Sequence, residues 1–205
     1  AAAGDLEIVD GSVRVVGTDR AIGFAEIATL PGVRPADLSA DGQYTPPEGT
    51  YPNGTHISEV EIDPETGAVA IVGYTICDDF GVTLNPLLLA GQVHGGIVQG
   101  IGQALLERTV YGEDGQLITA SFMDYAVPRA ADAPSFHFET RNVPCTTNAL
   151  GIKGAGEAGT IAGAGTVMNA VVDALDRAYG IRHIDMPATP EAVYQAISVA
   201  RRKAA

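Results

Sequence analysis

The sequence predicts an α+β fold in which a mixed or largely antiparallel sheet packs against helices. Three observations support this prediction. Two segments alternate apolar and polar residues on either side of a turn, as β-hairpins do. Several longer segments place apolar residues at helical spacing. Hairpins and helices also follow one another without the strict strand–helix alternation that builds a parallel sheet.

Composition places the chain among ordinary globular proteins. Its 205 residues are 46% hydrophobic and 18% charged, which is enough to bury a core without disulfides. The 25 acidic and 12 basic residues give a formal net charge of -13, which opposes binding to nucleic acid or to an anionic membrane. No run reaches the roughly 18 continuous apolar residues of a membrane span. Because the first residue is Ala and not Met, we expect a processed chain or a part of a longer protein.

The two cysteines lie far apart in the sequence, at Cys77 and Cys145, and the four histidines are equally scattered. An iron–sulfur cluster or a structural zinc ion usually needs four ligands, so we expect neither in this chain and predict no metal ligands. Reduced thiols are typical of the cytoplasm, which is the expected location.

The first 50 residues predict a small separate unit. Residues 5–16 alternate around Asp10-Gly11, a dipeptide that suits a two-residue hairpin turn. Phe24, Ile27 and Ala28 then indicate a short helix. Residues 31–54, rich in Gly, Pro and Asp, are typical of a connector. We therefore predict a hairpin, helix and connector over 1–50 and a second domain over 51–205.

The second domain is predicted to contain a hairpin, a strand and three helices. The hairpin covers residues 56–77 and turns at 64–67, and the strand covers 136–143. One helix spans 86–108. A glycine-dense loop over 151–165 leads into a helix with Val167, Val171, Ala174 and Leu175 on one face. The last helix starts at Thr189-Pro190, with Thr as N-cap.

The helix predicted over 86–108 carries five glycines, each of which costs up to about 1 kcal/mol relative to Ala. Gln92, Gln99 and Gln103 lie beside Gly95 and Gly96, opposite the apolar face. This face suits either a flat ligand bound by amides or a tight helix crossing with solvated glutamines, and the segment alone does not separate them. His94 lies toward the apolar side, where we expect a hydrogen-bonded core histidine.

Residues 153–159, KGAGEAG, match the GxGxxG pattern, but their context argues against a dinucleotide site. The preceding residues make a poor buried strand, and the Glu157 carboxylate would repel a pyrophosphate. Two interpretations remain for Glu157. Gly156 and its neighbours can form a tight loop that presents Glu157 as a general base, or Glu157 is a solvated loop residue.

The chain resembles the molybdopterin-binding large subunit of the xanthine oxidase and aldehyde oxidoreductase family, the molybdenum hydroxylases. Five ordered blocks carry the resemblance: YPNGTHISEVEIDPETG, DDFGVTLNPLLLAGQVHGGIVQGIGQALLE, GQLITASFMDYAVPRA, NALGIKGAGEAGT and HIDMPATPEAVYQAI. Ala149 follows Asn148 where family members often have Pro, a departure that affects loop stiffness more than chemistry.

The resemblance implies a function and a set of site residues. Glu157 matches the catalytic glutamate, Gln92 matches a glutamine that binds the pterin, and Gly95, Gly96 and Gly156 belong to the same cofactor-binding blocks. The implied cofactor is molybdenum-molybdopterin, with the cytosine dinucleotide form as one candidate, held jointly with an N-terminal portion of the subunit that this chain lacks. The implied reaction hydroxylates an aldehyde or N-heterocycle with oxygen from water and passes electrons to iron–sulfur and FAD partners.

Two other classes of function stay open at this point. The chain could be a non-catalytic structural or interaction module with an incomplete site. It could also be a nucleotide-binding module that uses the glycine loop, against which the context of that loop argues. As a fragment of a hydroxylase, the chain alone is expected to be inactive.

Overall fold

The computed structural model describes residues 1–204, and the chain divides into two compact units, Ala1–Thr45 and Pro46–Ala205. The division falls between Thr45 and Pro46, slightly before the boundary predicted after residue 50. Residues 46–50 belong with the second unit, in which the Thr50 hydroxyl accepts a hydrogen bond from the Gly154 N–H at 3.0 Å.

The first unit is a three-stranded antiparallel sheet with a short helix. Its elements are β1 (Leu6–Val9), β2 (Ser12–Val15), β3 (Ala21–Gly23) and α1 (Phe24–Ile27), with 3-10 turns at Ala3–Asp5 and Pro35–Leu38. Asp10 and Gly11 form the β1–β2 turn with φ of 47° and 74°, the left-handed conformation expected there. The predicted hairpin and helix are confirmed. The third strand was not predicted.

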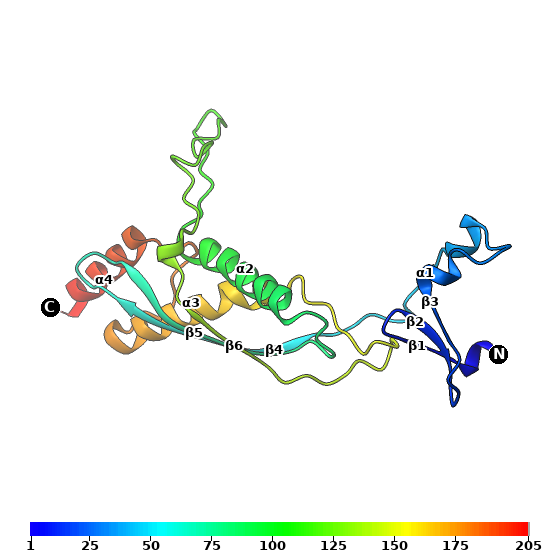
Figure 1. The fold of residues 1–205 in the computed structure, drawn as a ribbon. Coiled ribbons are helices and arrows are strands. Elements are labelled where there is room, and N and C mark those ends of the chain that lie inside the picture. Colours follow the sequence, from blue (N-terminus) through cyan, green and yellow to red (C-terminus); the bar gives the residue numbers. More distant parts are fainter. Residues whose placement is uncertain (205) are drawn as a thin grey trace. The chain divides into compact units, whose positions relative to one another are not determined.

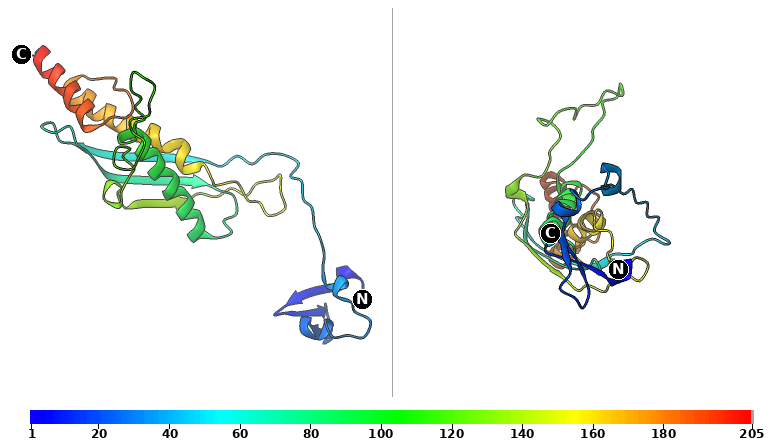
Figure 2. Two further views of the ribbon diagram at one scale, coloured as in Figure 1. Left: turned by 90° about the horizontal axis from the view of Figure 1, so that it is seen from above. Right: turned by 45° about the vertical axis from the view of Figure 1, so that its right-hand side comes forward.

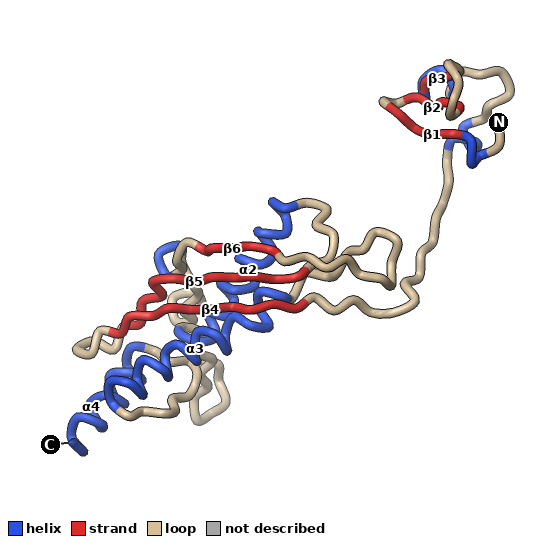
Figure 3. The backbone as a smooth tube through the Cα atoms, turned by 90° about the horizontal axis from the view of Figure 1, so that it is seen from below, coloured by secondary structure: helices blue, strands red, loops and turns tan. Residues whose placement is uncertain are grey.

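The second unit contains a mixed sheet in the order β4 (Asn53–Ile62), β5 (Val69–Asp79) and β6 (Phe136–Thr140). β4 and β5 form the predicted antiparallel hairpin, and β6 pairs with β5 in parallel, with Tyr74 opposite Phe136. Figure 3 shows the three strands side by side. The expectation of a mixed sheet in an α+β fold is therefore confirmed.

Helices α2 (Pro86–Leu105) and α3 (Ala158–Tyr179) lie on one face of this sheet, as Figure 1 and the left view of Figure 2 show. Helix α4 (Pro190–Ala204) follows, and the Thr189 hydroxyl accepts a hydrogen bond from the Ala192 N–H at 3.3 Å, as expected of an N-cap. The apolar faces of the three helices and the sheet enclose one core. Its fully buried side chains include Tyr74, Ile76, Val93, Ile97, Ile101, Val167, Val171, Leu175, Val193 and Ile197.

The predicted loop over 151–165 is wrong in its second half, because α3 already begins at Ala158. Two of the glycines in this half, Gly159 and Gly163, lie at the crossing with α2. A Cβ on Gly159 would meet the Val93 carbonyl oxygen, and one on Gly163 would lie 3.2 Å from the Gly100 Cα. Close contact between the two backbones therefore selects these glycines and outweighs their low helix propensity.

Helix α3 is long and apolar enough, by length and composition alone, to cross a membrane. Its apolar residues have another explanation here, since Val167, Val171 and Leu175 are buried in the core. His94 also differs from expectation: its ring stacks on Phe136, with 4.9 Å between ring centroids, and its Nε2 is buried without a hydrogen-bond partner among the described residues. Aromatic packing, not hydrogen bonding, holds this ring.

Candidate functional site

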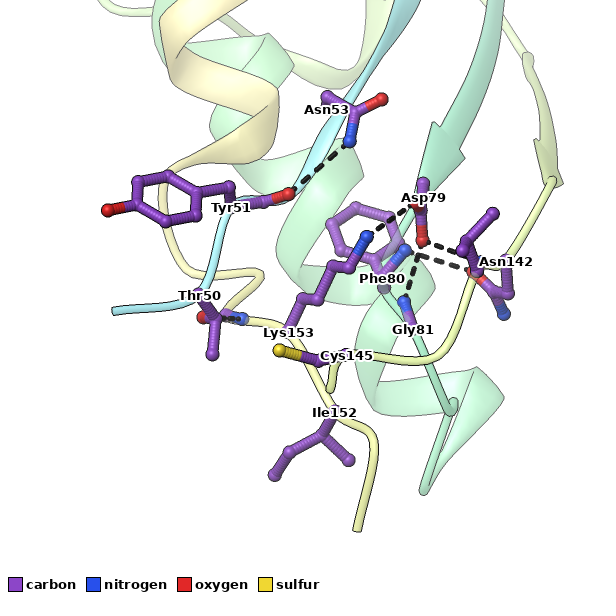
Figure 4. Close-up of polar contacts among 12 residues, drawn as sticks. Thr50, Tyr51, Asn53, Asp79, Phe80, Gly81, Asn142, Cys145, Ile152 and Lys153 are labelled. Atoms are coloured by element: carbon purple, nitrogen blue, oxygen red, sulfur yellow. Dashed lines mark hydrogen bonds and ion pairs between the residues drawn. The ribbon is translucent and has the colours of Figure 1, made fainter. Parts of the chain in front are cut away.

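A buried ion pair anchors the glycine-rich loop that precedes α3. The Lys153 Nζ lies 2.6 Å from the Asp79 Oδ2 at the end of β5, and the two side chains are only 12% and 11% exposed. The Asp79 Oδ1 accepts hydrogen bonds from the backbone N–H groups of Gly81 and Val143, at 2.8 and 3.0 Å. Figure 4 shows these contacts converging on one carboxylate. They tie the loop and two other segments to the sheet.

These contacts set the charge state of Asp79. Burial alone raises the pKa of this carboxyl, but the hydrogen bonds from Lys153, Val143 and Gly81 and the Lys153 charge outweigh it and lower the pKa to about 2. The carboxylate is therefore ionised at neutral pH and acts as a fixed negative partner for Lys153.

Backbone hydrogen bonds complete the anchor. The Val82 N–H donates to the Gly151 carbonyl and the Lys153 N–H donates to the Phe80 carbonyl, each at 2.9 Å. Gly151 has a φ of 67°, which favours glycine, and a Cβ on Gly81 would meet the Gly151 carbonyl oxygen. These contacts fix the path of the backbone that continues from Lys153 toward Glu157.

Glu157 lies at the other, exposed end of this loop. It immediately precedes α3, its side chain makes no capping hydrogen bond, and the residue is exposed to solvent in the described chain. The Ile161 N–H donates to the Glu157 carbonyl at 3.0 Å, which fixes the backbone at the start of the helix. The fold therefore presents the Glu157 carboxylate outward from a fixed position.

A pocket of about 450 Å³ lies beside Glu157. It is enclosed by the start of β4, the end of β5, the loop and the first turn of α3. The residues lining it are Thr50, Tyr51, Pro52, Asn53, Gly54, His56, Asp78, Gly154, Gly156, Glu157, Ala158, Ile161 and Ala162. Its volume falls within the range of small-molecule sites.

Gln92 lines a neighbouring pocket of about 240 Å³, together with Lys153 and Ala155. Alternate loop residues therefore face the two pockets: Gly154 and Gly156 line the first, and Lys153 and Ala155 line the second. The structure brings Gln92 and Glu157 to opposite sides of one loop. Their roles, like that of Gly156, stay predictions.

Gly95 and Gly96 have different surroundings. Gly95 is exposed, and a Cβ placed on it would meet nothing within 4 Å. Gly96 is buried, and its Cβ would lie 2.7 Å from the Thr160 backbone nitrogen in α3. The contact that Gly96 makes in this structure is with another helix backbone, one of the two alternatives that the sequence left open. A cofactor contact remains a prediction for both glycines.

Sequence reasoning missed a second buried pair, which lines the pocket beside Glu157. The His56 Nε2 lies 3.3 Å from the Asp78 Oδ2, and the two side chains are only 3% and 4% exposed. The His56 Nδ1 lies 3.1 Å from the Tyr74 hydroxyl oxygen. The alternation along the predicted hairpin places His56 on the same face as Val60 and Ile62, so a polar residue at an inward position was the available signal.

The comparisons with known proteins agree with the five sequence blocks. A family model described as the molybdopterin cofactor-binding domain matches residues 1–134. The gamma subunit of the 6-hydroxypseudooxynicotine dehydrogenase complex of Paenarthrobacter nicotinovorans is 40% identical over 93% of this chain and 25% of its own length. The nicotine 6-hydroxylase large subunit of the same organism is 36% identical over 94% of this chain and 24% of its own length.

Solved structures give the same result. The chain superposes on quinoline 2-oxidoreductase from Pseudomonas putida 86 with a TM-score of 0.84 and 35% identity, covering 97% of this chain and 26% of the other. For a Cu,Mo carbon monoxide dehydrogenase the TM-score is 0.80 and the identity 30%, with the same coverage of both chains. The chain spans about a quarter of the length of the curated relatives it matches.

Proposed function

The chain belongs to the molybdopterin cofactor-binding domain family, and from this premise we propose that it is the C-terminal part of a molybdenum hydroxylase. Such an enzyme is an oxidoreductase that hydroxylates an aldehyde or an N-heterocycle with oxygen from water. The names of the similar nicotine 6-hydroxylase and quinoline 2-oxidoreductase favour an N-heterocycle. The proposal rests on the anchored loop. This loop presents Glu157 to the pocket of about 450 Å³ and lines the neighbouring pocket together with Gln92.

The residues around the loop fit a molybdopterin cofactor. The N–H groups of Ala155, Gly156 and Glu157 donate no hydrogen bond to the described residues. The exposed amide of Gln92 is likewise free of protein partners there. Neutral donors and acceptors of this kind suit the hydrogen-bonding edge of a pterin. Gln92, Gly156 and the open face at Gly95 would hold the cofactor, in a cytosine dinucleotide or another form.

The bound molybdenum cofactor supplies the two-electron oxidation and activates the water-derived oxygen. The part of this chain in that reaction is proton transfer. The Glu157 carboxylate accepts a proton at one of its oxygens as the new carbon–oxygen bond forms. The Asp79–Lys153 pair acts as a positioning pair, because it holds the loop that carries Glu157. A base in hydrogen-bonding reach of the proton typically contributes 10² to 10⁴ in rate.

Glu157→Gln in the complete, cofactor-loaded enzyme tests this proposal. The substitution keeps the size of the side chain and removes its basic site. We expect molybdenum and pterin content to stay near wild type, while the rate of cofactor bleaching by substrate under anaerobic conditions falls by about 10² to 10⁴. The matched control is Glu61→Gln, which neutralises an exposed glutamate on β4 outside both pockets. A Glu157→Gln rate within threefold of wild type would show that Glu157 is not the base.

We also infer that this chain alone is inactive and works with partners. It spans about a quarter of its relatives, so the rest of the cofactor site is expected in the remaining portion of the subunit. The names of the relatives as gamma and large subunits support assembly into a complex, for which we propose iron–sulfur and FAD modules and a cytoplasmic location. Metal analysis and a visible spectrum of the isolated chain test this, and stoichiometric molybdenum would contradict it.

A further inference from the structure

We propose that Asp78, held in place by His56, binds an N–H or ammonium group of the ligand in the pocket beside Glu157. The inference rests on the proposed function in that the ligand belongs to the same site. It adds a chemical class to that site: a ligand that offers a nitrogen-bound hydrogen is favoured over one that carries a carboxylate.

A chain of hydrogen bonds orients Asp78. A carboxylate only accepts hydrogen bonds, so the His56 Nε2–H is assigned as the donor to the Asp78 Oδ2 across 3.3 Å, and the His56 Nδ1 lies 3.1 Å from the Tyr74 hydroxyl oxygen. Burial raises the pKa of Tyr74 above its usual range, which keeps this hydroxyl a donor. The His56 ring, which contacts Tyr74 through Nδ1, therefore holds the Asp78 carboxylate through Oδ2.

The second oxygen of Asp78 is left free. The Oδ1 has no hydrogen-bond partner among the described residues, although 96% of the side chain is removed from solvent, its exposed fraction being 4%. Asp78 pairs with Gly54 across β4 and β5, and a Cβ on Gly54 would collide with this oxygen. The absence of a side chain at residue 54 thus makes room for the Asp78 carboxylate beside the pocket that both residues line. Oδ1 is not among the fully buried side-chain atoms that lack a partner, so it keeps contact with the pocket that Asp78 lines, and a ligand can donate a hydrogen bond to it there.

The pocket in front of Asp78 has the charge and shape for such a donor. Its described lining includes the carboxyl groups of Asp78 and Glu157 and no lysine or arginine, because Lys153 faces the neighbouring pocket. Its walls are apolar at Tyr51, Pro52 and Ile161. Apolar walls with a few placed polar groups are typical of small-ligand sites. A negatively charged ligand would be repelled, and an aromatic or aliphatic body with an N–H group would fit both features.

Two ligands of the site carry this chemistry. One is a small-molecule substrate with an amine, an ammonium group or a ring N–H. The other is the aminopyrimidinone ring of the pterin, which also presents N–H donors. The experiment therefore has one arm for each source, and neither arm requires turnover.

The first arm measures equilibrium binding to the complete, oxidised, cofactor-loaded enzyme by calorimetry. The probes are benzylamine, benzyl alcohol and benzoate, which share a ring and differ in the polar group. We expect benzylamine to bind at least about tenfold more tightly than benzoate in the wild type, and Asp78→Asn to weaken benzylamine binding about tenfold or more. Glu61→Gln, which removes a negative charge outside the pocket, is expected to change it less than twofold.

The second arm measures molybdenum and pterin per subunit in the same proteins, with folding followed by thermal melting. Loss of benzylamine affinity at unchanged cofactor content assigns Asp78 to the substrate. Loss of cofactor in folded Asp78→Asn, but not in Glu61→Gln, assigns it to the pterin. If Asp78→Asn keeps both its benzylamine affinity and its cofactor content, the inference is overturned.

His56→Gln decides the matter if Asp78→Asn does not fold, since it keeps the carboxylate and removes the group that orients it. We expect a severalfold loss of benzylamine affinity or of cofactor content, and wild-type values of both would overturn the inference. Because binding and content are read without turnover, a negative result here leaves the Glu157→Gln experiment to judge the proposed function separately.

Discussion

Both the α2–α3 crossing and the loop before α3 are rich in glycine. The surroundings of the two sets of glycines are opposite. At the crossing, a Cβ on Gly100 would lie 2.6 Å from the Ala164 backbone nitrogen, and a Cβ on Gly159 would lie 2.9 Å from the Ile97 nitrogen. In the loop, a Cβ on Gly156 would meet nothing within 4 Å, and one on Gly154 only the Thr50 hydroxyl at 3.8 Å. The first set lets two backbones pack, and the second leaves space for a ligand.

This difference means that the loop needs another source of rigidity. The crossing is held by direct contact between backbones in the core. The loop has few such contacts, and its position depends on the Asp79–Lys153 pair and on the hydrogen bonds around Gly151. Packing therefore holds the crossing, and buried charge with local hydrogen bonds holds the loop.

Lys153→Met should lower the free energy of unfolding of the chain by about 3 to 5 kcal/mol, because it leaves the Asp79 carboxylate buried without its cation. Chemical denaturation measures the effect, and Lys203→Met, at an exposed residue of α4, is the control, expected within about 0.5 kcal/mol. A loss below about 1 kcal/mol for Lys153→Met would mean that the backbone hydrogen bonds alone hold the loop.

Gly159→Ala should cost about 2 to 3 kcal/mol, because its methyl group would force the two helix backbones apart. Gly156→Ala is the matched substitution in the loop and should change stability by no more than about 0.5 kcal/mol. Chemical denaturation of both variants compares the two regions directly. Equal losses of stability in the two variants would show that close packing does not distinguish the crossing from the loop.

The Asp79–Lys153 pair should stabilise the folded chain at neutral pH and lose this effect in acid. The pKa of Asp79 is lowered from 3.8 to about 2 in the folded chain, so its contribution is present above pH 4 and is lost as the pH falls from about 4 to about 2. The shift corresponds to about 2 kcal/mol. Unfolding measured from pH 6 to pH 2 should show a steeper acid loss for the wild type than for Asp79→Asn. Parallel curves would contradict the assigned pKa.

Gly95→Ala should stabilise the chain by up to about 1 kcal/mol, since Gly95 is exposed within a helix and has open space around it. Gly96→Ala, one residue further, should be destabilising because of the Thr160 backbone. Cofactor content of the complete enzyme adds a second readout. A loss of cofactor in Gly95→Ala at full stability would support the predicted cofactor contact of Gly95, and unchanged content would argue against it.

Features that depend on near neighbours in the chain were predictable from the amino-acid sequence. The Asp10-Gly11 turn, the β4–β5 hairpin and the Thr189 N-cap follow from local conformational preferences and short-range hydrogen bonds, and all three are present as predicted. The five ordered blocks also identified the family, because each block keeps several residues at fixed spacing.

Contacts between residues that are distant in the sequence depend on how the helices and strands pack together. Lys153 reaches Asp79 across a long sequence separation, and such a pair leaves no periodic trace in the chain. The start of α3 at Ala158 is of the same kind: local propensity favours a loop at these glycines, and burial against α2 outweighs it. Packing between elements supplies free energy that a single segment cannot reveal, so the anchor of the loop and the free oxygen of Asp78 become visible only in the folded chain.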